Sequence, residues 1–588
     1  MSEIDALGGE MGRAADASLI QSRTLNKGKG AAVHALRAQC DRTEYHLYMK
    51  KALERQENLD IKQDEVRELI IEPVGADGSV RPDALRRGLT GEQGRSPLQS
   101  VAVGVKTRLG LFYGAKAVVI ATGTYLDAEI HIGENSFPSG ADGVLPSTGF
   151  GASLEEAGIK LRRFKTGTPA RINRRSVDFT KMQEQGGDDV ITPFSFAFDV
   201  VLENFVPCHI TYTNAETHRV IRENLHRSPL YGGRINLGRG PRYCPSIEDK
   251  IVRFADKERH QVFVEPMGLH TDEMYLQGLS SSLPVEVQEE FIRTIAGLEN
   301  AEIMRHAYAI EYLCCDPSVL YATLEFKSIG GLFSAGQFNA TSGYEEAAGQ
   351  GLIAGVNAAR KVMGREPYIL PRSSSYIGTL IDDLVTKGCD EPYRMMTSRS
   401  EYRLLLRQDN APERLAEIGH ELGLLGRERF QAFRESREII QNEIKRLKKT
   451  TAKPTPLLNK ILEKRGTTPI TNGVRIADIL KRPEIGYDDL IEAELGSVEI
   501  PPRLRQKIEI EVKYEGYIRL QLEQIRKTQG LEDKKLPADA DYRTINGLST
   551  EAAEKLNRHK PLNIGQAGRV SGVNPADVAV LLVWLSAK

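Results

Sequence analysis

The 588-residue sequence lacks the features that would place it among membrane, disulfide-rich or strongly charged proteins. Six cysteines without a Cys-x-x-Cys pair are too few and too scattered for a disulfide framework, and they fit a reducing cytoplasm. The most apolar run, Val578 to Leu585, is too short to span a bilayer, and the acidic start MSEIDALGGEMG is not a signal peptide. A net charge of −1 creates no overall attraction for nucleic acid, so any such contact must come from local basic patches. We therefore expect a cytoplasmic protein with no membrane partner.

The length and the composition along the chain predict several domains, since 588 residues exceed what one core usually holds. The region up to Gln337 is rich in glycine and short β-type runs, whereas long charged helices are expected from about Leu415. The apolar run Lys116 to Gly123 predicts a strand buried on both faces of a parallel sheet. Together these patterns indicate an α/β nucleotide-binding body with a helical C-terminal domain.

Individual elements can be placed within this outline. The expected helices cover Val33 to Arg55, Arg427 to Lys449, Arg503 to Lys527, and a closing pair near Ala552 to Leu585. The expected strands cover Val66 to Glu72, Val101 to Val105 and Leu109 to Tyr113. Gly75 to Pro97 is expected to be an exposed insertion. The closing pair should flank a Ser-Gly-Val-Asn-Pro turn, as a small module for RNA or a protein partner, or as plain packing.

The strongest local signal is Gly330 to Gln337 followed by Thr341 to Arg360, which predicts a short strand ending at Gly336 and then a helix. Ser342 and Glu345 have the spacing of a capping box. Glycines and alanines inside the helix leave one face nearly free of side chains, so that the helix can pack closely on a sheet or a cofactor. Its N-terminus can stabilise negative charge on a reduced flavin. A helix that merely packs tightly on a sheet is the alternative.

A second signal is Ala121 to Thr124, where a Thr-Gly pair follows the expected buried strand. Such a strand end allows the backbone to approach a ligand, although many parallel strands end in the same way.

The stretch Gly238 to Phe254 contains a candidate nucleophile, Cys244. Pro245 suits the first position of a helix and would place Cys244 at its N-cap. There the positive end of the helix and nearby Arg242 both favour a thiolate, which could add to an electron-poor carbon. Packing as a small apolar residue is the equally open alternative. The other cysteines are expected to be buried packing residues: Cys40, Cys208, Cys314, Cys315 and Cys389. No histidine cluster has metal spacing, so no metal is expected.

The segment Glu391 to Asn410 interleaves four arginines with two tyrosines. Arginine forks match phosphates and tyrosines can stack on unpaired bases, so Arg394, Arg399, Arg403 and Arg407 are candidate RNA-binding residues. The surrounding residues 391–470 hold 17 Lys and Arg against 11 Asp and Glu. A salt-bridged solvated face is the alternative, with Glu391, Glu401 and Asp409 as partners.

Taken in order, these segments resemble one family, the large subunit of the tRNA uridine 5-carboxymethylaminomethyl modification system, also called glucose-inhibited division protein A. The matching motifs are Leu25-Asn-Lys-Gly-Lys-Gly30 with Arg37-Ala-Gln39, Lys165-Thr-Gly-Thr-Pro169, Gly240-Pro-Arg-Tyr-Cys-Pro-Ser-Ile-Glu-Asp-Lys250, Gly343-Tyr-Glu-Glu346, Glu391-Pro-Tyr-Arg394 and Lys513-Tyr-Glu-Gly-Tyr517. The similarity runs from residue 5 to residue 585.

The resemblance implies an FAD-binding Rossmann-type domain with an inserted NADH-binding domain and an all-helical C-terminal domain. The implied boundaries are 1–165 and 301–365 for the two parts of the FAD domain, 166–300 for the insertion, and 366–588 for the helical domain that binds tRNA and partners. It also implies a homodimer that forms a heterotetramer with a partner GTPase. The implied reaction adds an aminomethyl-type group to C5 of the wobble uridine, with methylene-tetrahydrofolate as one-carbon donor.

Carried over by position, the resemblance implies FAD contacts at Val66, Ser147 and Gln337, to which the strand ends add Thr122, Gly123 and Gly336. It implies NADH contacts at Gly240, Pro241, Arg242, Tyr243, Cys244, Pro245, Ser246, Ile247, Glu248, Asp249, Lys250, Ile251, Val252, Arg253 and Phe254. Cys244 matches a cysteine proposed to act in catalysis in that family, either by attacking C6 of the uracil or as an acid or base near the flavin.

The sequence departs from the family pattern in lacking the first strand, the G-x-G-x-x-G turn and the helix that hold the FAD pyrophosphate. We expect a gap in the core where the central strand would lie, and we interpret the chain as a truncated version of a normal enzyme. Two alternatives remain: an RNA- or GTPase-binding protein with impaired FAD binding, and a folate- and FAD-dependent tRNA uracil methyltransferase. The second lacks a long helical C-terminal domain.

Overall fold

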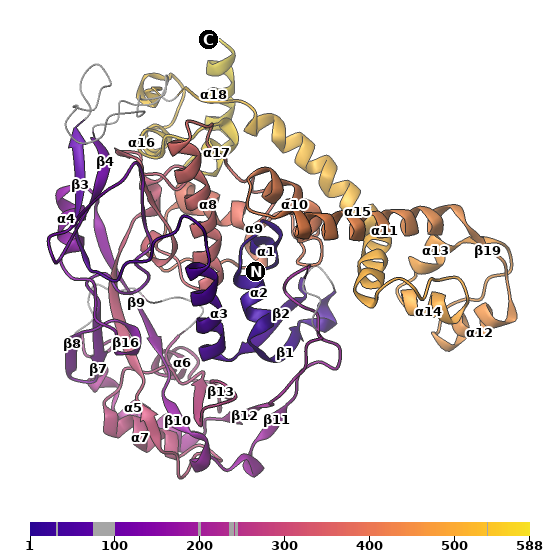
Figure 1. Ribbon diagram of the computed structural model, residues 1–588, viewed down its shortest axis with the longest axis horizontal. Coiled ribbons are helices and arrows are strands. Elements are labelled where there is room, and N and C mark those ends of the chain that lie inside the picture. Colours follow the sequence, from indigo (N-terminus) through magenta and orange to yellow (C-terminus); the bar gives the residue numbers. More distant parts are fainter. Residues whose placement is uncertain are drawn as a thin grey trace.

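The computed structural model describes residues 1–30, 33–73, 100–197, 201–233, 240, 245–537 and 539–587. The chain forms a broad mixed α/β body from which an elongated helical arm projects to one side (Figure 1). The expected insertion Gly75 to Pro97 lies outside the described residues. No helix in the described ranges is long and apolar enough to cross a membrane.

The centre of the body holds two parallel strand pairs that bring distant parts of the chain together. Strand β6 (Val118–Ile120) pairs with β18 (Leu332–Ser334), and β4 (Ser100–Thr107) pairs with β17 (Ile329–Gly330). Antiparallel β3 (Val66–Pro73) and β5 (Phe112–Gly114) flank β4, which confirms the predicted strands and hairpin. The long helix α8 (Tyr344–Val362) and the short helix α4 (Phe150–Glu156) contribute buried residues to the same apolar core.

Strand β6 departs from the prediction of a strand buried on both faces. Ile120 at its end is buried, but the side chain of Val119 in its middle is 40% exposed. Among the described residues β6 pairs only with β18, so that its other edge has no neighbouring strand. An apolar run in the sequence is typical of a central strand, but its burial depends on having strands on both sides.

The first 54 residues form a small unit of two helices, a hairpin and a third helix. They comprise α1 (Ser2–Ala6), α2 (Met11–Ala17), β1 (Leu19–Leu25), β2 (Ala35–Cys40) and α3 (Arg42–Glu54). The helix predicted from Val33 therefore begins nine residues later. The residues before it form β2 because they pair with β1, and the Asp41 side chain starts α3 by accepting hydrogen bonds from the backbone of Thr43 and Glu44.

A second, antiparallel sheet lies beside the centre, with strand order β8-β7-β16-β9. Its strands are β7 (Glu129–Ile132), β8 (Asn135–Pro138), β9 (Leu161–Thr168) and β16 (Tyr308–Cys315). Strands β9 and β16 pair along their whole length, from Tyr308 opposite Thr168 to Cys315 opposite Leu161. This long pairing joins the two ends of the middle part of the chain.

The middle part forms a six-stranded sheet with order β11-β12-β13-β14-β10-β15, at the bottom of Figure 1. The strands are β10 (Arg171–Asn173), β11 (Gln183–Gln185), β12 (Cys208–Tyr212), β13 (Gln261–Pro266), β14 (Glu273–Gln277) and β15 (Ile303–Arg305). Helices α5 (Ala215–Glu223), α6 (Ile247–Arg253) and α7 (Val285–Arg293) share an apolar core with this sheet.

From Tyr376 onward the regular elements are almost all helices, in keeping with the expected helical C-terminal domain. The helices are α9 (Tyr376–Lys387), α10 (Ala411–Glu421), α11 (Arg427–Lys449), α12 (Pro456–Lys464), α13 (Ile476–Leu480), α14 (Tyr487–Glu492), α15 (Pro502–Glu532), α16 (Thr550–His559), α17 (Ile564–Arg569) and α18 (Pro575–Ser586). A two-stranded ribbon of β19 (Thr451–Ala452) and β20 (Val474–Arg475) lies between them.

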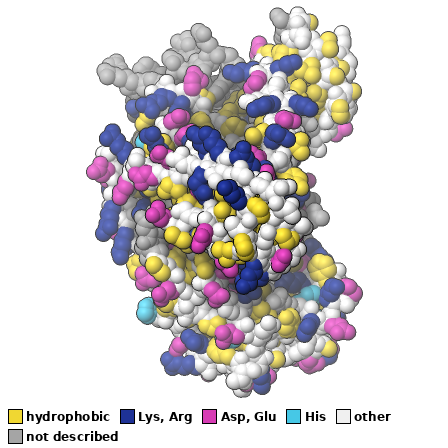
Figure 2. Space-filling view, turned by 90° about the vertical axis from the view of Figure 1, so that its right-hand side faces the viewer, with side chains coloured by type: hydrophobic (Ala, Val, Ile, Leu, Met, Phe, Trp, Pro, Cys, Tyr) yellow, Lys and Arg dark blue, Asp and Glu magenta, His cyan; other side chains and the backbone are white. Residues whose placement is uncertain are grey.

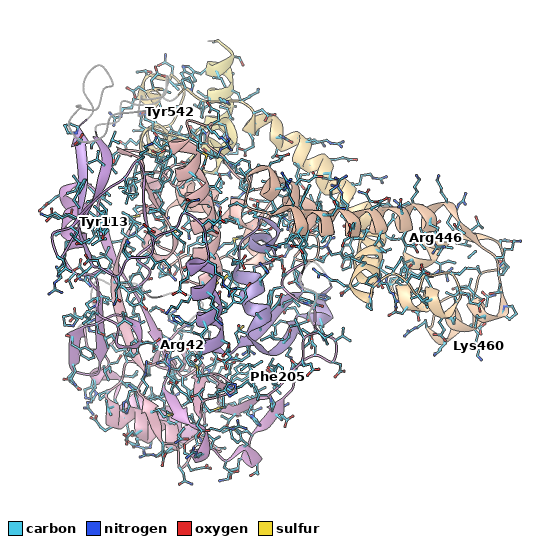
Figure 3. All side chains as sticks on the ribbon, viewed as in Figure 1. Arg42, Tyr113, Phe205, Arg446, Lys460 and Tyr542 are labelled. Carbon is cyan, nitrogen blue, oxygen red and sulfur yellow. The ribbon has the colours of Figure 1, made fainter. Side chains whose placement is uncertain are left out.

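Two apolar cores divide this helical region. One joins α11 to α14 with the start of α15 in the projecting arm, on which Arg446 and Lys460 are labelled in Figure 3. The other joins α16, α17 and α18 at the opposite end of α15 (Figure 1). The space-filling view that faces the arm shows Lys and Arg side chains mixed with Asp and Glu (Figure 2), in keeping with the small net charge.

Candidate functional site

A cavity of about 580 Å³ lies where the two sheets of the body meet the segment that follows helix α9. Residues from widely separated parts of the chain line it: Lys165, Thr166, Gly167, Leu230, Gly240, Ser246, Asp249, Arg253, Ser280, Ser281, Ser282, Tyr308, Ala309, Gly388, Cys389, Asp390, Glu391, Tyr393 and Arg399. Three of the motifs that carry the family resemblance therefore meet at one cavity. Its volume is in the range of small-molecule sites.

Strand β9 brings the Lys-Thr-Gly motif to the cavity by pairing with β16. Gly167 lies opposite Ala309, and an added Cβ at Gly167 would stand 2.8 Å from the hydroxyl oxygen of Ser280 and 3.1 Å from the backbone oxygen of Tyr308. Those distances are shorter than a side chain tolerates. A glycine at this position thus allows Ser280 to Ser282, which form the serine wall of the cavity, to approach the strand.

Helix α6 reaches the cavity with its N-terminal end, and its first residue corrects the sequence prediction. Ser246, not Cys244, is the N-cap: its hydroxyl accepts a hydrogen bond from the backbone of Asp249, whose carboxylate accepts one from the backbone of Ser246. This capping box fixes where the helix starts. Pro245 had suggested an earlier start because proline is common in the first turn.

The predicted nucleophile cannot be placed in this geometry. Pro241, Arg242, Tyr243 and Cys244 lie outside the described residues, so their predicted roles stay predictions. Gly240 and Pro245 border that gap, and Gly240 lines the cavity.

Behind the cavity wall lies a fully buried carboxyl group, that of Glu248. One of its oxygens accepts hydrogen bonds from the hydroxyl of Ser281 (3.1 Å) and from the backbone (2.9 Å) and hydroxyl (3.4 Å) of Ser282, while its other oxygen has no partner. Burial raises the pKa of Glu248, and the positive charge of Lys165 opposes this rise. The arrangement holds the serine wall in place and ties it to helix α6.

The third wall is formed by residues 388–399, which follow helix α9. Tyr393 is buried and donates its hydroxyl hydrogen to Asp383 at 2.8 Å, while the guanidinium of Arg399 lies 4.2 Å from the centre of the tyrosine ring. Cys389 also lines the cavity. Burial raises the pKa of the Cys389 thiol to about 12, so it remains protonated at neutral pH, in agreement with the prediction of a packing cysteine.

A second site lies at the carboxyl ends of the parallel strands β6 and β18. The backbone N–H of Ala335 donates to the oxygen of Ile120 at 2.9 Å, which places Thr122 and Gly123 beside Gly336. Both glycines have positive φ angles, +57° and +75°, which side chains disfavour. The hydroxyl oxygen of Thr122 is buried without a partner. Ligands of open α/β sheets bind at such strand ends.

The remaining predicted flavin contacts lie around this strand end. Gln337 is part of the short 3₁₀ helix η8 (Gly336–Asn339) that connects β18 to α8. Ser147 exchanges backbone hydrogen bonds with Tyr125 and Asp127, just after the Thr-Gly pair. Val66 begins β3, next to Glu65, whose carboxylate accepts a hydrogen bond from the backbone of Thr148 at 2.8 Å. The predicted contacts are therefore neighbours in space.

Helix α8 follows this site but begins differently from the prediction. Its N-cap is Gly343, without a side-chain cap, and the hydroxyl of Ser342 instead donates to the backbone oxygen of Tyr393. Part of its small-residue face is open, because an added Cβ at Gly351 or Gly355 would meet nothing within 4 Å, whereas one at Gly349 would meet Ile377 at 3.3 Å.

These residues fit part of a flavin dinucleotide. The glycine-bearing strand ends, the unpartnered hydroxyl of Thr122 and the open face of α8 provide backbone approach and free space. The sequence of residues 1–588 contains no G-x-G-x-x-G turn to hold a pyrophosphate.

The strand-end site and the cavity are close to each other. Burial, followed by the charges of Asp142 and Tyr308, raises the pKa of Tyr125, which comes just after the Thr-Gly strand end. Tyr308 lines the cavity, and its hydroxyl oxygen accepts a hydrogen bond from the backbone of Asp142 at 3.0 Å.

The four candidate RNA-binding arginines have different surroundings. Arg403 is exposed, and Arg399 lines the cavity. Arg394 is half-exposed and pairs with Glu346 at 3.3 Å. Arg407 is fully buried and pairs with Asp409 and Glu511, each at 3.0 Å, so the structure does not support an RNA contact for it. The salt-bridge alternative thus describes Arg407.

Several cavity residues were missed by sequence reasoning. The serine run Ser280 to Ser282 and Tyr308 carry no motif of their own and reach the site only through the pairing of β9 with β16 and the packing of α6. Lys165 belongs to the motif Lys165-Thr-Gly-Thr-Pro169, for which the sequence indicates a family resemblance but no role. The described residues contain no group of side chains that could hold a metal ion.

The fold and the two sites define a mixed α/β protein with a ligand site at parallel strand ends, an inserted sheet domain and a helical C-terminal region. Comparison with known proteins gives the family. The sequence model of "Glucose inhibited division protein A" matches residues 1–366, and two models of the C-terminal helical domain and C-terminal helical bundle of the "tRNA modifying enzyme MnmG/GidA" match residues 427–522 and 524–588.

The similarity to individual proteins covers almost the whole chain. The tRNA uridine 5-carboxymethylaminomethyl modification enzyme of Caldicellulosiruptor saccharolyticus is 56% identical over 99% of this chain and 89% of its own length. Its counterpart in Alkaliphilus oremlandii is 51% identical over all of this chain and 89% of its own length. A solved structure of Aquifex aeolicus GidA superposes with a TM-score of 0.86 at 45% identity, covering 99% of this chain and 89% of that one. The chain belongs to the glucose-inhibited division protein A family.

Proposed function

We propose that this chain modifies the wobble uridine of transfer RNA, adding an aminomethyl or carboxymethylaminomethyl group at C5 with FAD, NADH and a folate-derived one-carbon unit. The relatives that it matches at 50% identity or more are named for the 5-carboxymethylaminomethyl modification of tRNA uridine. The matched models of the helical region favour this function over that of a uracil methyltransferase, since that alternative lacks the long helical C-terminal domain.

The observation that carries this proposal is the convergence at the cavity. Lys165, Ser246 and Tyr393 come from motifs more than 80 residues apart in sequence, and the fold brings them to one space of about 580 Å³. A chain that had kept only a binding function would not need these three motifs at one cavity.

The second site supports a role for flavin. FAD, when bound, supplies the hydride chemistry that reduces a one-carbon fragment. Thr122, Gly123, Ser147, Gly336 and Gln337 would hold it, and the N-terminal end of α8 would favour negative charge on its ring. The described part of the predicted NADH segment, Gly240 and Pro245 to Phe254, contributes Gly240, Ser246, Asp249 and Arg253 to the neighbouring cavity.

Within the cavity the chain's own residues orient the reactants. Glu248 fixes the hydroxyls of Ser281 and Ser282, whose oxygens each keep one lone pair to accept a hydrogen bond from a bound molecule. We further propose that Cys244 supplies the nucleophile or the acid–base group, that the chain works as a homodimer in the cytoplasm, and that it forms a heterotetramer with a GTPase of the same pathway. The arm and the C-terminal bundle would provide the partner and tRNA contacts.

A complementation experiment tests the function. Bacteria that lack their own member of the family receive this chain, a Cys244→Ser variant or an empty vector, and the nucleosides of total tRNA are separated by liquid chromatography and mass spectrometry. The proposal predicts that only the unaltered chain restores the C5-modified uridine. An equal restoration by Cys244→Ser would remove Cys244 from the mechanism, and no restoration by the unaltered chain would favour a non-catalytic binding protein.

Flavin binding separates the same alternatives in purified protein. Oxidised flavin absorbs blue light, so that a flavin enzyme is yellow and a pure binding module is colourless. We expect added FAD to remain with the chain through gel filtration. Loss of all absorbance in the flavin band would contradict the proposed cofactor.

A further inference from the structure

Two positively charged side chains line the cavity without a carboxylate at ion-pair distance among the described residues, although the charge of Lys165 also acts on the buried Glu248. Among the described residues neither Lys165 nor Arg399 takes part in an ion pair, although both are half-buried and both line the same space. By contrast, Arg253 in the same cavity lies 3.8 Å from Asp249. An unpaired half-buried cation costs desolvation energy, which an anionic ligand would offset.

The surroundings of the two cations hold them toward the cavity. Lys165 lies on β9 opposite Glu311 of β16, and its side chain passes next to Gly240, where an added Cβ would stand 2.8 Å from its Cε atom. The Arg399 guanidinium rests on the ring of Tyr393, which is itself anchored to Asp383. A guanidinium that stacks on a buried ring keeps its N–H groups at its edge free to bind an anion.

Hydroxyl acceptors lie in the same cavity as the cations. The hydroxyls of Ser281 and Ser282 donate to Glu248. The Ser281 oxygen also accepts from the backbone N–H of Leu283 at 3.2 Å, and the Ser282 oxygen lies 3.2 Å from the hydroxyl of Ser228, so each oxygen keeps one lone pair for a ligand. The missing side chain of Gly167 leaves room for the hydroxyl of Ser280, which would stand 2.8 Å from a Cβ at that position. A ligand that carries both an anionic group and hydroxyl or N–H donors matches this combination, and a nucleotide is such a molecule.

We propose that the cavity receives one nucleotide of the RNA substrate, with a phosphate held jointly by Lys165 and Arg399 and with hydroxyl groups donating to Ser281 and Ser282. The proposal rests on the proposed function and names the substrate group bound at that site. RNA is favoured over the dinucleotide as the source of this phosphate because Arg399 belongs to the segment 391–410 and not to the predicted NADH segment, and Arg403 adds a further exposed cation outside the cavity. The segment joins the cavity to the helical region.

Binding of an RNA probe to the whole chain tests the proposal without any cofactor. A fluorescein-labelled anticodon stem-loop with uridine at the wobble position is titrated with the chain and with Lys165→Met, Arg399→Met and the double variant. Each single variant should weaken binding by about 10-fold or more, the usual loss for one charge-assisted contact. The double variant should lose clearly less than the product of the single losses, because both cations hold the same phosphate.

Control variants separate the loss of a cavity contact from a loss of folding and from a general loss of positive charge. Lys165→Arg retains the charge and should bind within about threefold of the unaltered chain, whereas Arg399→Lys retains the charge but loses the stacked guanidinium and should bind more weakly than the unaltered chain and more tightly than Arg399→Met. Arg403→Met, in the same segment but outside the cavity, should be additive with either cavity variant. Circular dichroism of each variant checks the fold, and the charge-retaining pair gives an answer even if a methionine variant misfolds.

Several results would overturn the inference. An unchanged RNA affinity in both single variants would contradict it. A loss of affinity in the double variant equal to the product of the two single losses would also contradict it. If the variants weakened NADH binding, followed by its nicotinamide fluorescence, and left RNA binding intact, the cations would serve the dinucleotide instead. Normal tRNA modification together with unaltered RNA binding in the variants would overturn this inference and leave the proposed function standing. RNA binding through both cations without any modification would support the inference and contradict the function.

Discussion

The hydroxyl of Tyr393 donates a hydrogen bond to the buried carboxylate of Asp383 at 2.8 Å, and this bond anchors the wall of the cavity that carries Arg399. Asp383 also pairs with Arg372 at 3.0 Å and with Lys387 at 2.6 Å. These positive charges and hydrogen bonds outweigh burial and lower its pKa. The residues 388–399 are thus fastened to helix α9, although they contain little regular secondary structure.

Tyr393→Phe should destabilise the chain by about 1–3 kcal/mol, since a buried acceptor loses one donor. The shift of the urea unfolding midpoint measures the loss. Tyr113→Phe is the matched control, because Tyr113 is 38% exposed on β5 (Figure 3) and should change stability little. Equal midpoints for the two variants would show that the Tyr393–Asp383 bond contributes nothing.

Arg407 should behave as a structural residue. Its replacement by methionine removes the buried guanidinium and its hydrogen bonds to the partly exposed carboxylates of Asp409 and Glu511, which should cost about 1–3 kcal/mol. Arg403→Met, four residues earlier and exposed, should change stability by less than about 0.5 kcal/mol. Thermal melting of both variants makes the comparison. A larger loss for Arg403→Met than for Arg407→Met would contradict the surroundings described for these two arginines.

Two glycines should respond to alanine in opposite directions. Gly167→Ala would place a Cβ 2.8 Å from the Ser280 hydroxyl oxygen, so the serine wall must shift and the expected cost is about 1–3 kcal/mol. Gly351→Ala meets open space in the middle of helix α8 and should stabilise by up to about 1 kcal/mol. Differential scanning calorimetry measures both. Destabilisation by Gly351→Ala would show that the open face of α8 is covered in solution.

Asp16 should make stability depend on pH in the acidic range. It is buried and accepts hydrogen bonds from the backbone of Phe194 and Ser195, and burial raises its pKa to about 6 from 3.8. The folded chain therefore binds this proton more tightly than the unfolded chain does. The stability that it contributes is complete below about pH 4 and is lost as the pH rises through about 6, by up to roughly 3 kcal/mol.

Asp16→Asn removes this titration and is the test. Unfolding midpoints measured from pH 4 to pH 8 should fall less steeply for the variant than for the unaltered chain between pH 4 and 6. Parallel curves for the two proteins would contradict the raised pKa of Asp16.

Sequence reasoning predicted elements whose signals are local. Helix α11 runs from Arg427 to Lys449 as expected, because an amphipathic pattern of 23 residues is enough to define it. The start of α6 was placed wrongly, since Pro245 and Ser246 are both common at helix starts and only the reciprocal hydrogen bonds with Asp249 distinguish them.

Features that depend on distant partners could not be predicted in the same way. The exposure of Val119 depends on whether a strand lies beside β6. The burial of Arg407 depends on Glu511, more than 100 residues away in α15. The cavity joins Lys165 to Arg399 through the pairing of β9 with β16 and the position of α9, neither of which is encoded by either residue alone.

The central claim, that the converging motifs form the site of tRNA wobble-uridine modification, is tested most directly by mass mapping of one transfer RNA. An unmodified transcript is incubated with the purified chain, the partner GTPase with GTP, FAD, NADH, methylene-tetrahydrofolate and glycine or ammonium, and is then cut by a guanosine-specific ribonuclease. The account predicts added mass only in the fragment that contains the wobble uridine, and none when cytidine replaces that uridine. An unchanged fragment, under conditions in which the Caldicellulosiruptor saccharolyticus relative adds the group, would contradict it.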